Sequence, residues 1–159
     1  MKLMHSEWKD RVRHWVRTLQ DDFYEPLGEI RWEAFRTMDH ISPEEALQKE
    51  FTAVEPGFTW GKTWEYCWFK GTVVLPKGAE GKRIVMDLDA GGESTVFVNG
   101  KSFGNYRAAW VDEAHQFIED NCLAVCGKEG DTYEILMETY AGHFYPEAPT
   151  GGCATGPVL

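Results

Sequence analysis

Hydrophobic positions follow a helical period at the start of the chain and a period of two in its second half. The first apolar stripe has the spacing i, i+4, i+7, i+8 and i+11, which places its members on one helical face. Its members are Trp8, Val12, Trp15, Val16 and Leu19. The spacing predicts a helix over 7–20. We expect its tryptophan face to pack on the rest of the protein, although a basic amphipathic helix also suits a membrane surface or a partner.

A second helix is predicted over 42–50, where the sequence reads SPEEALQKE. Ser42 stands at the N-cap position, Pro43 at the first helical position and Glu45 two positions further on. This order is typical of a capping box. The helix must be short, because Pro56 and Gly57 follow it closely. The segment 29–35 between the two helices is expected to be irregular or partly extended.

From residue 65 onward the apolar residues alternate. In 65–76 one face of a predicted strand carries Cys67, Phe69, Val73 and Leu75, and the other carries Tyr66, Trp68, Lys70 and Thr72. Alternation of this kind indicates a strand. Further strands are expected over 83–89, 94–104, 113–119 and 132–142. The segment 94–104 should be a hairpin, because Asn99-Gly100 suits the two positive-φ positions of a type I′ turn.

Short strands separated by turn residues, without helices between them, are typical of an antiparallel β-sandwich or jelly roll. The expected fold is therefore mainly β, similar to galactose-binding domains, with one or two N-terminal helices. We expect a helical segment over 1–50 that packs on the sandwich, and the sandwich itself over 51–145. A Gly- and Pro-rich tail over 146–159 would lead toward a part of the protein that lies outside this sequence.

Charge limits the partners that we expect. The 159 residues include 16 Lys or Arg and 26 Asp or Glu, a formal net charge of −10. Nucleic acids and anionic membranes attract clusters of basic residues, so neither is an expected partner. No stretch resembles a signal peptide or a membrane span, so we expect a cytoplasmic protein. The four cysteines lack the spacing of a structural zinc site and are expected to be free thiols: Cys67, Cys122, Cys126 and Cys153.

Candidate chemistry is sparse. No nucleophile elbow, metalloprotease motif or phosphate-binding loop occurs, and we expect no catalytic residue and no metal ligand. Glycoside hydrolysis needs two carboxylates across a cleft, but the acidic residues of the strands fit solvated faces: Asp87, Asp89, Glu93, Glu134 and Glu138. Sugar binding needs aromatic surface beside polar groups. The candidates for such a site are Trp60, Trp64, Tyr66, Trp68, Tyr106 and Trp110, with Glu93 at its rim.

Four motifs, taken in their order along the chain, resemble one family. PGFTWGKTWEYCWFKGTVVLP is similar to the opening of the β-sandwich that precedes the catalytic domain in glycoside hydrolase family 38 α-mannosidases of the bacterial and fungal cytosolic or vacuolar type. RIVMDLDAGGESTVFVNGKSFG and DEAHQFIED resemble later parts of the same domain, and YEILMETYAGH resembles the strand that closes it. The resemblance covers roughly residues 28–145.

The resemblance implies a non-catalytic accessory domain of a retaining α-mannosidase. The zinc ion of that family would belong to a catalytic domain outside this sequence, because its metal-binding motif is absent here. The expected partner is that catalytic domain, with carbohydrate as a further ligand and a homo-oligomer as a further option for the full-length protein. Two alternatives stay open: a free-standing carbohydrate-binding module, and the jelly-roll domain of an enzyme of the β-galactosidase or β-glucuronidase type.

Overall fold

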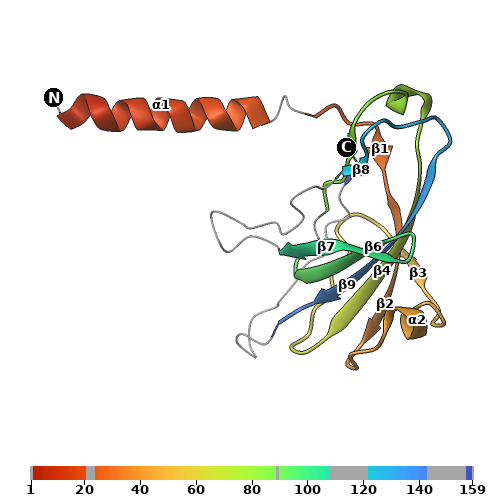
Figure 1. Cartoon of the computed structure of the whole chain (residues 1–159). Coiled ribbons are helices and arrows are strands. Elements are labelled where there is room, and N and C mark those ends of the chain that lie inside the picture. The colour runs from red at the N-terminus through yellow and green to blue at the C-terminus, as the bar shows by residue number, and fades with distance from the viewer. Residues whose placement is uncertain (1, 21–23, 89, 108–121, 143–156, 159) are drawn as a thin grey trace.

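A six-stranded antiparallel sheet dominates the fold (Figure 1). The computed structural model describes residues 2–20, 24–88, 90–107, 122–142 and 157–158. The helical elements are α1 (Lys2–Gln20), α2 (Pro43–Ala46) and the 3-10 turn η1 (Lys77–Ala79). The strands are β1 (Gly28–Glu29), β2 (Arg31–Thr37), β3 (Thr52–Val54), β4 (Tyr66–Val74), β5 (Ile84–Val85), β6 (Glu93–Val98), β7 (Lys101–Arg107), β8 (Cys122–Ala124), β9 (Thr132–Tyr140) and β10 (Pro157–Val158).

The strand order of the large sheet is β3-β2-β4-β9-β6-β7, and every neighbouring pair is antiparallel. β2 pairs with β4 along its whole length, from Arg31 opposite Thr72 to Thr37 opposite Tyr66. The segment 29–35, expected to be irregular or partly extended, therefore contributes a regular strand. The sandwich boundary expected at residue 51 falls inside the sheet. Charged residues alternate with Trp32 and Ala34 over too few positions to reveal the strand from its sequence alone.

The inner face of the sheet is the one that carries Cys67, Phe69 and Val73 of β4, and these side chains belong to the main core. Ile135 and Met137 of β9 join them there. The alternation predicted for these two strands is confirmed. Because burying a large apolar side chain contributes about 1.5–3 kcal/mol, this face supplies much of the driving force for folding.

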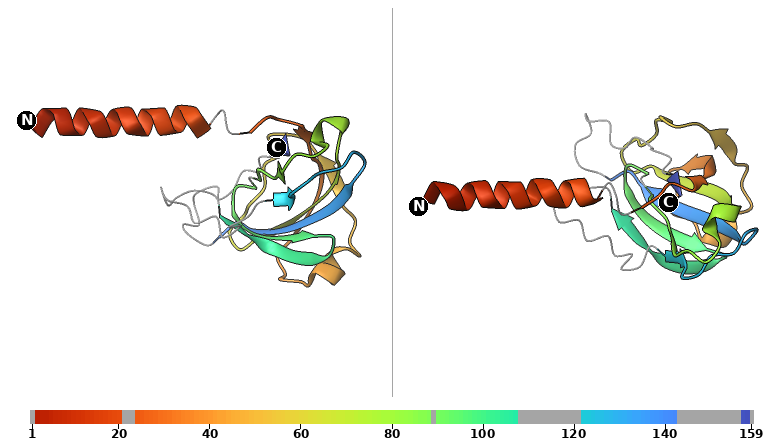
Figure 2. Two further views of the ribbon diagram at one scale, coloured as in Figure 1. Left: turned by 45° about the horizontal axis from the view of Figure 1, so that its top comes forward. Right: turned by 90° about the horizontal axis from the view of Figure 1, so that it is seen from above.

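Two small sheets, β5–β8 and β1–β10, accompany the large one (Figure 2). Ile84, Met86 and Leu88 pack in the same core cluster as Phe69, so this part of the chain covers the inner face. The arrangement confirms the predicted mainly antiparallel β class. The strand expected over 83–89 is shorter than predicted, since only Ile84–Val85 pair with β8.

Local turn chemistry agrees with the sequence. Asn99 has a φ of 49° and Gly100 a φ of 72°, the positive values that a type I′ turn needs between β6 and β7. Ser42 Oγ accepts a hydrogen bond from the Glu45 backbone N–H at 3.2 Å, and Glu45 Oε2 accepts one from the Ser42 N–H at 3.0 Å. The predicted capping box is therefore present. The helix that it starts is only four residues long.

The outer face of the sheet, which carries Tyr66, Trp68 and Lys70, is covered at one end by α2 and its flanking loops. There Ala46, Trp68 and Leu136 form a second buried cluster. Partly buried aromatic and aliphatic residues close around it: Phe35, Ile41, Phe51 and Phe97. The rings described below lie next to this cluster, where Tyr66 and Tyr140 pair at the end of the β4–β9 ladder.

Helix α1 confirms the predicted amphipathic helix but not its expected packing. In all three views it extends away from the sandwich (Figures 1 and 2). Trp8 is 63% exposed and Trp15 is 65% exposed, so the stripe does not pack on the sandwich in this structure. An apolar stripe shows that a helix has a face to bury, but it does not identify the surface that buries it.

Some predictions fall outside the described residues, among them the strand over 113–119 and the state of Cys153. In the tail, Pro157 and Val158 pair with β1, a short strand that the sequence did not predict. Cys67, Cys122 and Cys126 are free thiols, as predicted.

Candidate functional site

Two of the tryptophans proposed for sugar binding lie inside the protein. Trp60 is 3% exposed, and its Nε1 donates a hydrogen bond to the Ala90 carbonyl oxygen at 3.1 Å. Trp68 is fully buried under the cover that α2 provides. Neither ring can offer a face to a ligand, so the structure does not support these two candidates. The sequence placed Trp68 on the outer face correctly but could not show that this face is covered there.

Trp64 has the opposite environment. It is 57% exposed and has a φ of 69°, an outlier for a bulky residue. Hydrogen bonds hold its backbone on both sides: the Trp64 N–H donates to the Gly142 carbonyl oxygen at 3.0 Å, and the Ala141 N–H donates to the Glu65 carbonyl oxygen at 3.0 Å. The loop thus keeps Trp64 beside the end of β9.

The buried carboxylate of Glu65 stabilises the loop that carries Trp64. Its Oε2 accepts hydrogen bonds from the backbone N–H groups of Gly61 at 3.0 Å and Lys62 at 2.9 Å. Its Oε1 lies 4.0 Å from Arg36 Nε. A buried carboxylate needs such partners, and here they fix the chain immediately before Trp64.

A row of aromatic rings continues from Trp64 across the outer face. The ring centroids of Trp64 and Tyr140 are 6.5 Å apart, those of Tyr140 and Tyr66 are 4.9 Å apart, and those of Tyr66 and His40 are 5.4 Å apart. Tyr66 and Tyr140 are opposite each other in the β4–β9 ladder, which explains their short distance. We call Trp64, Tyr140, Tyr66 and His40 the ring row.

Glu93 of β6 lies beside the ring row, because it is in register with Tyr140 of β9. Burial raises the pKa of Tyr140, and Tyr66 and the charge of Glu93 raise it further. Glu93 is exposed. The structure therefore brings together Trp64 and Glu93, which sequence reasoning had proposed for the site. The alternation of β9 in the sequence places Tyr140 and Glu138 on the face opposite Ile135. The sequence of β9 alone did not show which residues of β4 and β6 lie beside them.

Glu138 lies two ladder positions further along, on the same face of the sheet and opposite Trp68. Its side chain is 15% exposed, and Oε1 lies 3.4 Å from His40 Nε2. The contact lacks the geometry of a hydrogen bond: in the described part of the chain, Glu138 Oε1 and Trp68 Nε1 are both buried without a hydrogen-bond partner. Burial raises the pKa of Glu138, and the nearby His40 opposes this rise.

The raised pKa of Glu138 predicts a specific pH dependence. Since the folded-state pKa is higher than the unfolded one, protonation stabilises the fold, and this contribution is lost as pH rises through the folded pKa. Glu138→Gln should remove that loss. At neutral pH its free energy of unfolding should exceed that of the wild type by at most about 1 kcal/mol, because a partly buried carboxylate whose Oε1 lacks a hydrogen-bond partner among the described residues is replaced by a neutral amide. Urea unfolding across the pH range measures both effects.

Glu134→Gln is the matched control for this measurement. Glu134 lies on the same strand and the same side of the sheet, but its side chain is exposed. This substitution should leave the pH profile of stability unchanged. A Glu138→Gln profile identical to that of the wild type would show that the Glu138 carboxyl is solvated in solution.

The remaining two candidates are not tested by the described residues. Tyr106 lies on β7, in register with Ser94 of β6, and Trp110 is outside the described residues. Both stay predictions. Of the carboxylates considered for hydrolysis, Glu93 and Glu138 lie beside the ring row, whereas Asp87 lies beyond β5 and Glu134 beside the hairpin of Asn99. Asp89 is outside the described residues.

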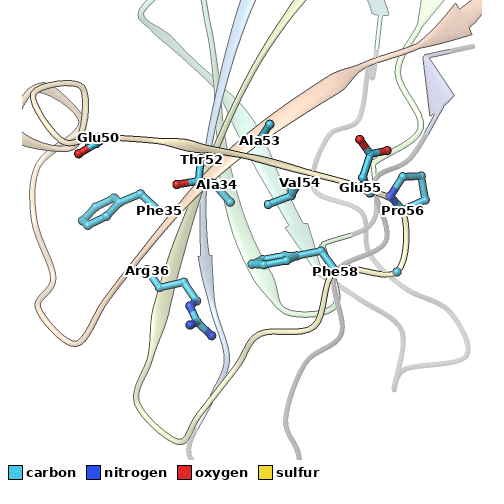
Figure 3. Close-up of a pocket in the computed structure, with 11 residues that line it drawn as sticks. Ala34, Phe35, Arg36, Glu50, Thr52, Ala53, Val54, Glu55, Pro56 and Phe58 are labelled. Carbon is cyan, nitrogen blue, oxygen red and sulfur yellow. The ribbon is translucent and has the colours of Figure 1, made fainter.

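A separate hollow of about 660 Å³ lies at the β2–β3 edge of the sheet. Glu50 and Glu55 stand at opposite ends of the segment that borders it, and the ring of Phe58 lies between that segment and Arg36 (Figure 3). The Phe58 ring packs edge-on against Phe69, with the centroids 6.5 Å apart. The hollow therefore combines charges of both signs with a ring that the core already uses, and the ring row is the better candidate for a binding surface.

Among the described residues, no three His, Cys, Asp or Glu side chains gather closely enough to hold a metal ion. No helix in the described ranges has the length and apolar character to cross a membrane.

The antiparallel sheet and the smaller strand pairs on its inner face define a β-sandwich domain of the jelly-roll class. The family described as "Alpha-mannosidase, jelly roll domain" matches residues 29–141, and the chain belongs to this family. The match favours the resemblance to α-mannosidases over the β-galactosidase or β-glucuronidase alternative.

Curated relatives agree with the family match. The chain is 31% identical over 68 residues to mouse (Mus musculus) Alpha-mannosidase 2C1, which covers 43% of this chain and 6% of the mouse protein. It is 27% identical over 104 residues to Dictyostelium discoideum Alpha-mannosidase G, covering 64% of this chain and 9% of that protein. The matched segment thus spans less than a tenth of the length of either relative.

Proposed function

We propose that this chain is a non-catalytic domain of an α-mannosidase and supports a catalytic domain elsewhere in the parent polypeptide. The observation that carries the proposal is the family match over residues 29–141, together with relatives that are named α-mannosidases. Hydrolysis of α-mannosides would belong to the parent polypeptide, as would a zinc ion in its catalytic domain. We expect the parent to be cytoplasmic, with neither nucleic acid nor membrane as a partner.

The surface of the chain supports a role in domain packing. Residues 1–20 contain five Lys or Arg and two Asp or Glu, which gives a formal charge of +3. Since the whole chain has a net charge of −10, residues 21–159 have a net charge of −13. Four apolar residues of α1 are exposed beside these basic residues: Trp8, Val12, Trp15 and Val16. Exposed apolar surface of this kind marks an interface, and amphipathic helices commonly dock in grooves of another domain. The catalytic domain of the parent is the partner that we propose for α1.

The decisive experiment compares the purified chain with its parent polypeptide in hydrolysis of an aryl α-mannoside, with Zn²⁺ or Co²⁺ added. We expect no turnover by the chain under conditions in which the parent is active, because catalysis would require residues outside this chain. Turnover by the purified chain would disprove the non-catalytic role. An inactive parent that hydrolyses aryl β-galactosides would disprove the assignment to α-mannosidases.

A further inference from the structure

The fold holds one large aromatic side chain at the surface under backbone strain. Trp60 and Trp68 are buried, whereas Trp64 is 57% exposed at a φ of 69°. Positive φ costs free energy for a residue with a bulky side chain, and such strain occurs at functional sites. Here the buried carboxylate of Glu65 and the backbone hydrogen bonds to 141–142 maintain it. Stability alone would favour glycine or asparagine at this position.

The ring row beside Trp64 forms a strip that combines aromatic rings with polar groups. Tyr140 and Tyr66 follow at centroid distances of 6.5 and 4.9 Å, with their ring planes tilted by 42° and 31°. With centroids this close, neighbouring rings overlap obliquely instead of lying in one plane, and the exposed Trp64 ring stands at the end of the row. Both tyrosines are only partly buried.

Two carboxylates border this strip. Glu93 is in register with Tyr140, and its charge contributes to the raised pKa of the Tyr140 hydroxyl. Glu138 lies on the same face, next to His40. Carboxylates accept hydrogen bonds from neighbouring hydroxyl groups, whereas two negative charges disfavour a phosphate or another anion.

We infer that Trp64, Tyr66 and Tyr140, together with Glu93, bind a neutral pyranose sugar. One face of a pyranose ring is apolar and suits an aromatic surface, and its hydroxyl groups suit carboxylate acceptors and phenol hydroxyls. An organic cation would be attracted by the same groups, but it is bound best by rings that surround it, and the rings among the described residues form a single row. The inference concerns this surface alone and is independent of the proposed role in an α-mannosidase.

The test uses the full 159-residue chain and the indole N–H signals of its tryptophans in ¹H–¹⁵N NMR spectra. Methyl α-mannopyranoside, methyl α-glucopyranoside and methyl α-galactopyranoside are titrated separately into the millimolar range. We expect at least one of them to shift the Trp64 signal. The Trp64 signal is assigned as the one that disappears in the Trp64→Gly spectrum. This substitution should weaken sugar binding by roughly tenfold or more, measured from the other signals that the sugar shifts.

Trp64→Gly also separates binding from folding. Because glycine accepts positive φ without strain, this variant should unfold at the same or a higher urea concentration than the wild type. Trp15→Ala is the matched control: Trp15 is similarly exposed, at 65%, but lies on α1, and its loss should leave the sugar response unchanged.

Three results would overturn the inference. The first is a Trp64 signal that none of the sugars shifts at millimolar concentration. The second is a Trp64 signal that tetramethylammonium chloride shifts while the sugars do not, which would identify the strip as a cation site. The third is an undiminished sugar response in Trp64→Gly. None of these results bears on whether the parent hydrolyses α-mannosides.

Discussion

Phe69→Ala is expected to lower the free energy of unfolding by about 3–5 kcal/mol, the usual cost of removing a large buried aromatic side chain. Phe69 is completely buried on the inner face of β4. Three rings contact it edge-on, with centroid distances of 6.4 Å for Trp32, 6.0 Å for Trp60 and 6.5 Å for Phe58. Its removal would leave a cavity that these rings, which come from separate segments, cannot close together.

Urea unfolding followed by circular dichroism measures this loss. Val74→Ala is the control, because Val74 lies on the same strand but is 61% exposed. Its effect should stay within about 1 kcal/mol, the range of strand propensities at exposed positions. Similar losses for the two variants would show that the inner face of β4 is not the packed core of the domain.

Gly92→Ala is expected to destabilise the fold by about 1–3 kcal/mol or more, the range that overpacking typically costs. A Cβ at residue 92 would lie 2.5 Å from the Tyr140 carbonyl oxygen and 2.9 Å from Thr139 Cγ2. The first contact is with backbone in the β9 ladder, which cannot rotate away. Relief therefore requires β6 and β9 to separate where Glu93 meets Tyr140.

Thermal unfolding of Gly92→Ala should show the lower midpoint, and Gly28→Ala provides the comparison. A Cβ at Gly28 would have no heavy atom within 4 Å, and this glycine is exposed at the edge of β1. Its substitution should change stability by less than about 1 kcal/mol. Equal midpoints for the two variants would mean that β6 approaches β9 less closely in solution than in this structure.

The same close approach affects the proposed sugar-binding surface. Gly92 lets β6 begin directly against β9, and the next residue, Glu93, thereby comes into register with Tyr140. The segment DLDAGGESTVFVNG thus has a structural role that also positions one carboxylate of the site. At the end of this segment, Asn99 and Gly100 close the hairpin because both residues have positive φ.

Features that depend on neighbouring residues could be predicted from the sequence. The alternation of β4 and β9, the type I′ hairpin at Asn99 and the capping box at Ser42 are all confirmed. Each rests on contacts within a few residues, where period and turn chemistry suffice. The family motifs also lie in these segments, which is why the resemblance to α-mannosidase jelly rolls could be seen and is confirmed by the family match.

Local patterns in the chain were enough to identify an antiparallel β domain of the α-mannosidase jelly-roll family with an amphipathic helix near its start. Three features depended on the folded arrangement: the burial of Trp60 and Trp68 beside an exposed Trp64, the place of β2 inside the sheet, and the pairing of Tyr66 with Tyr140. The folded arrangement also decided that α2 covers Trp68 while the stripe of α1 stays exposed. The physical reason is that burial and pairing depend on which distant segments come together, and a local pattern specifies only the face that each segment offers.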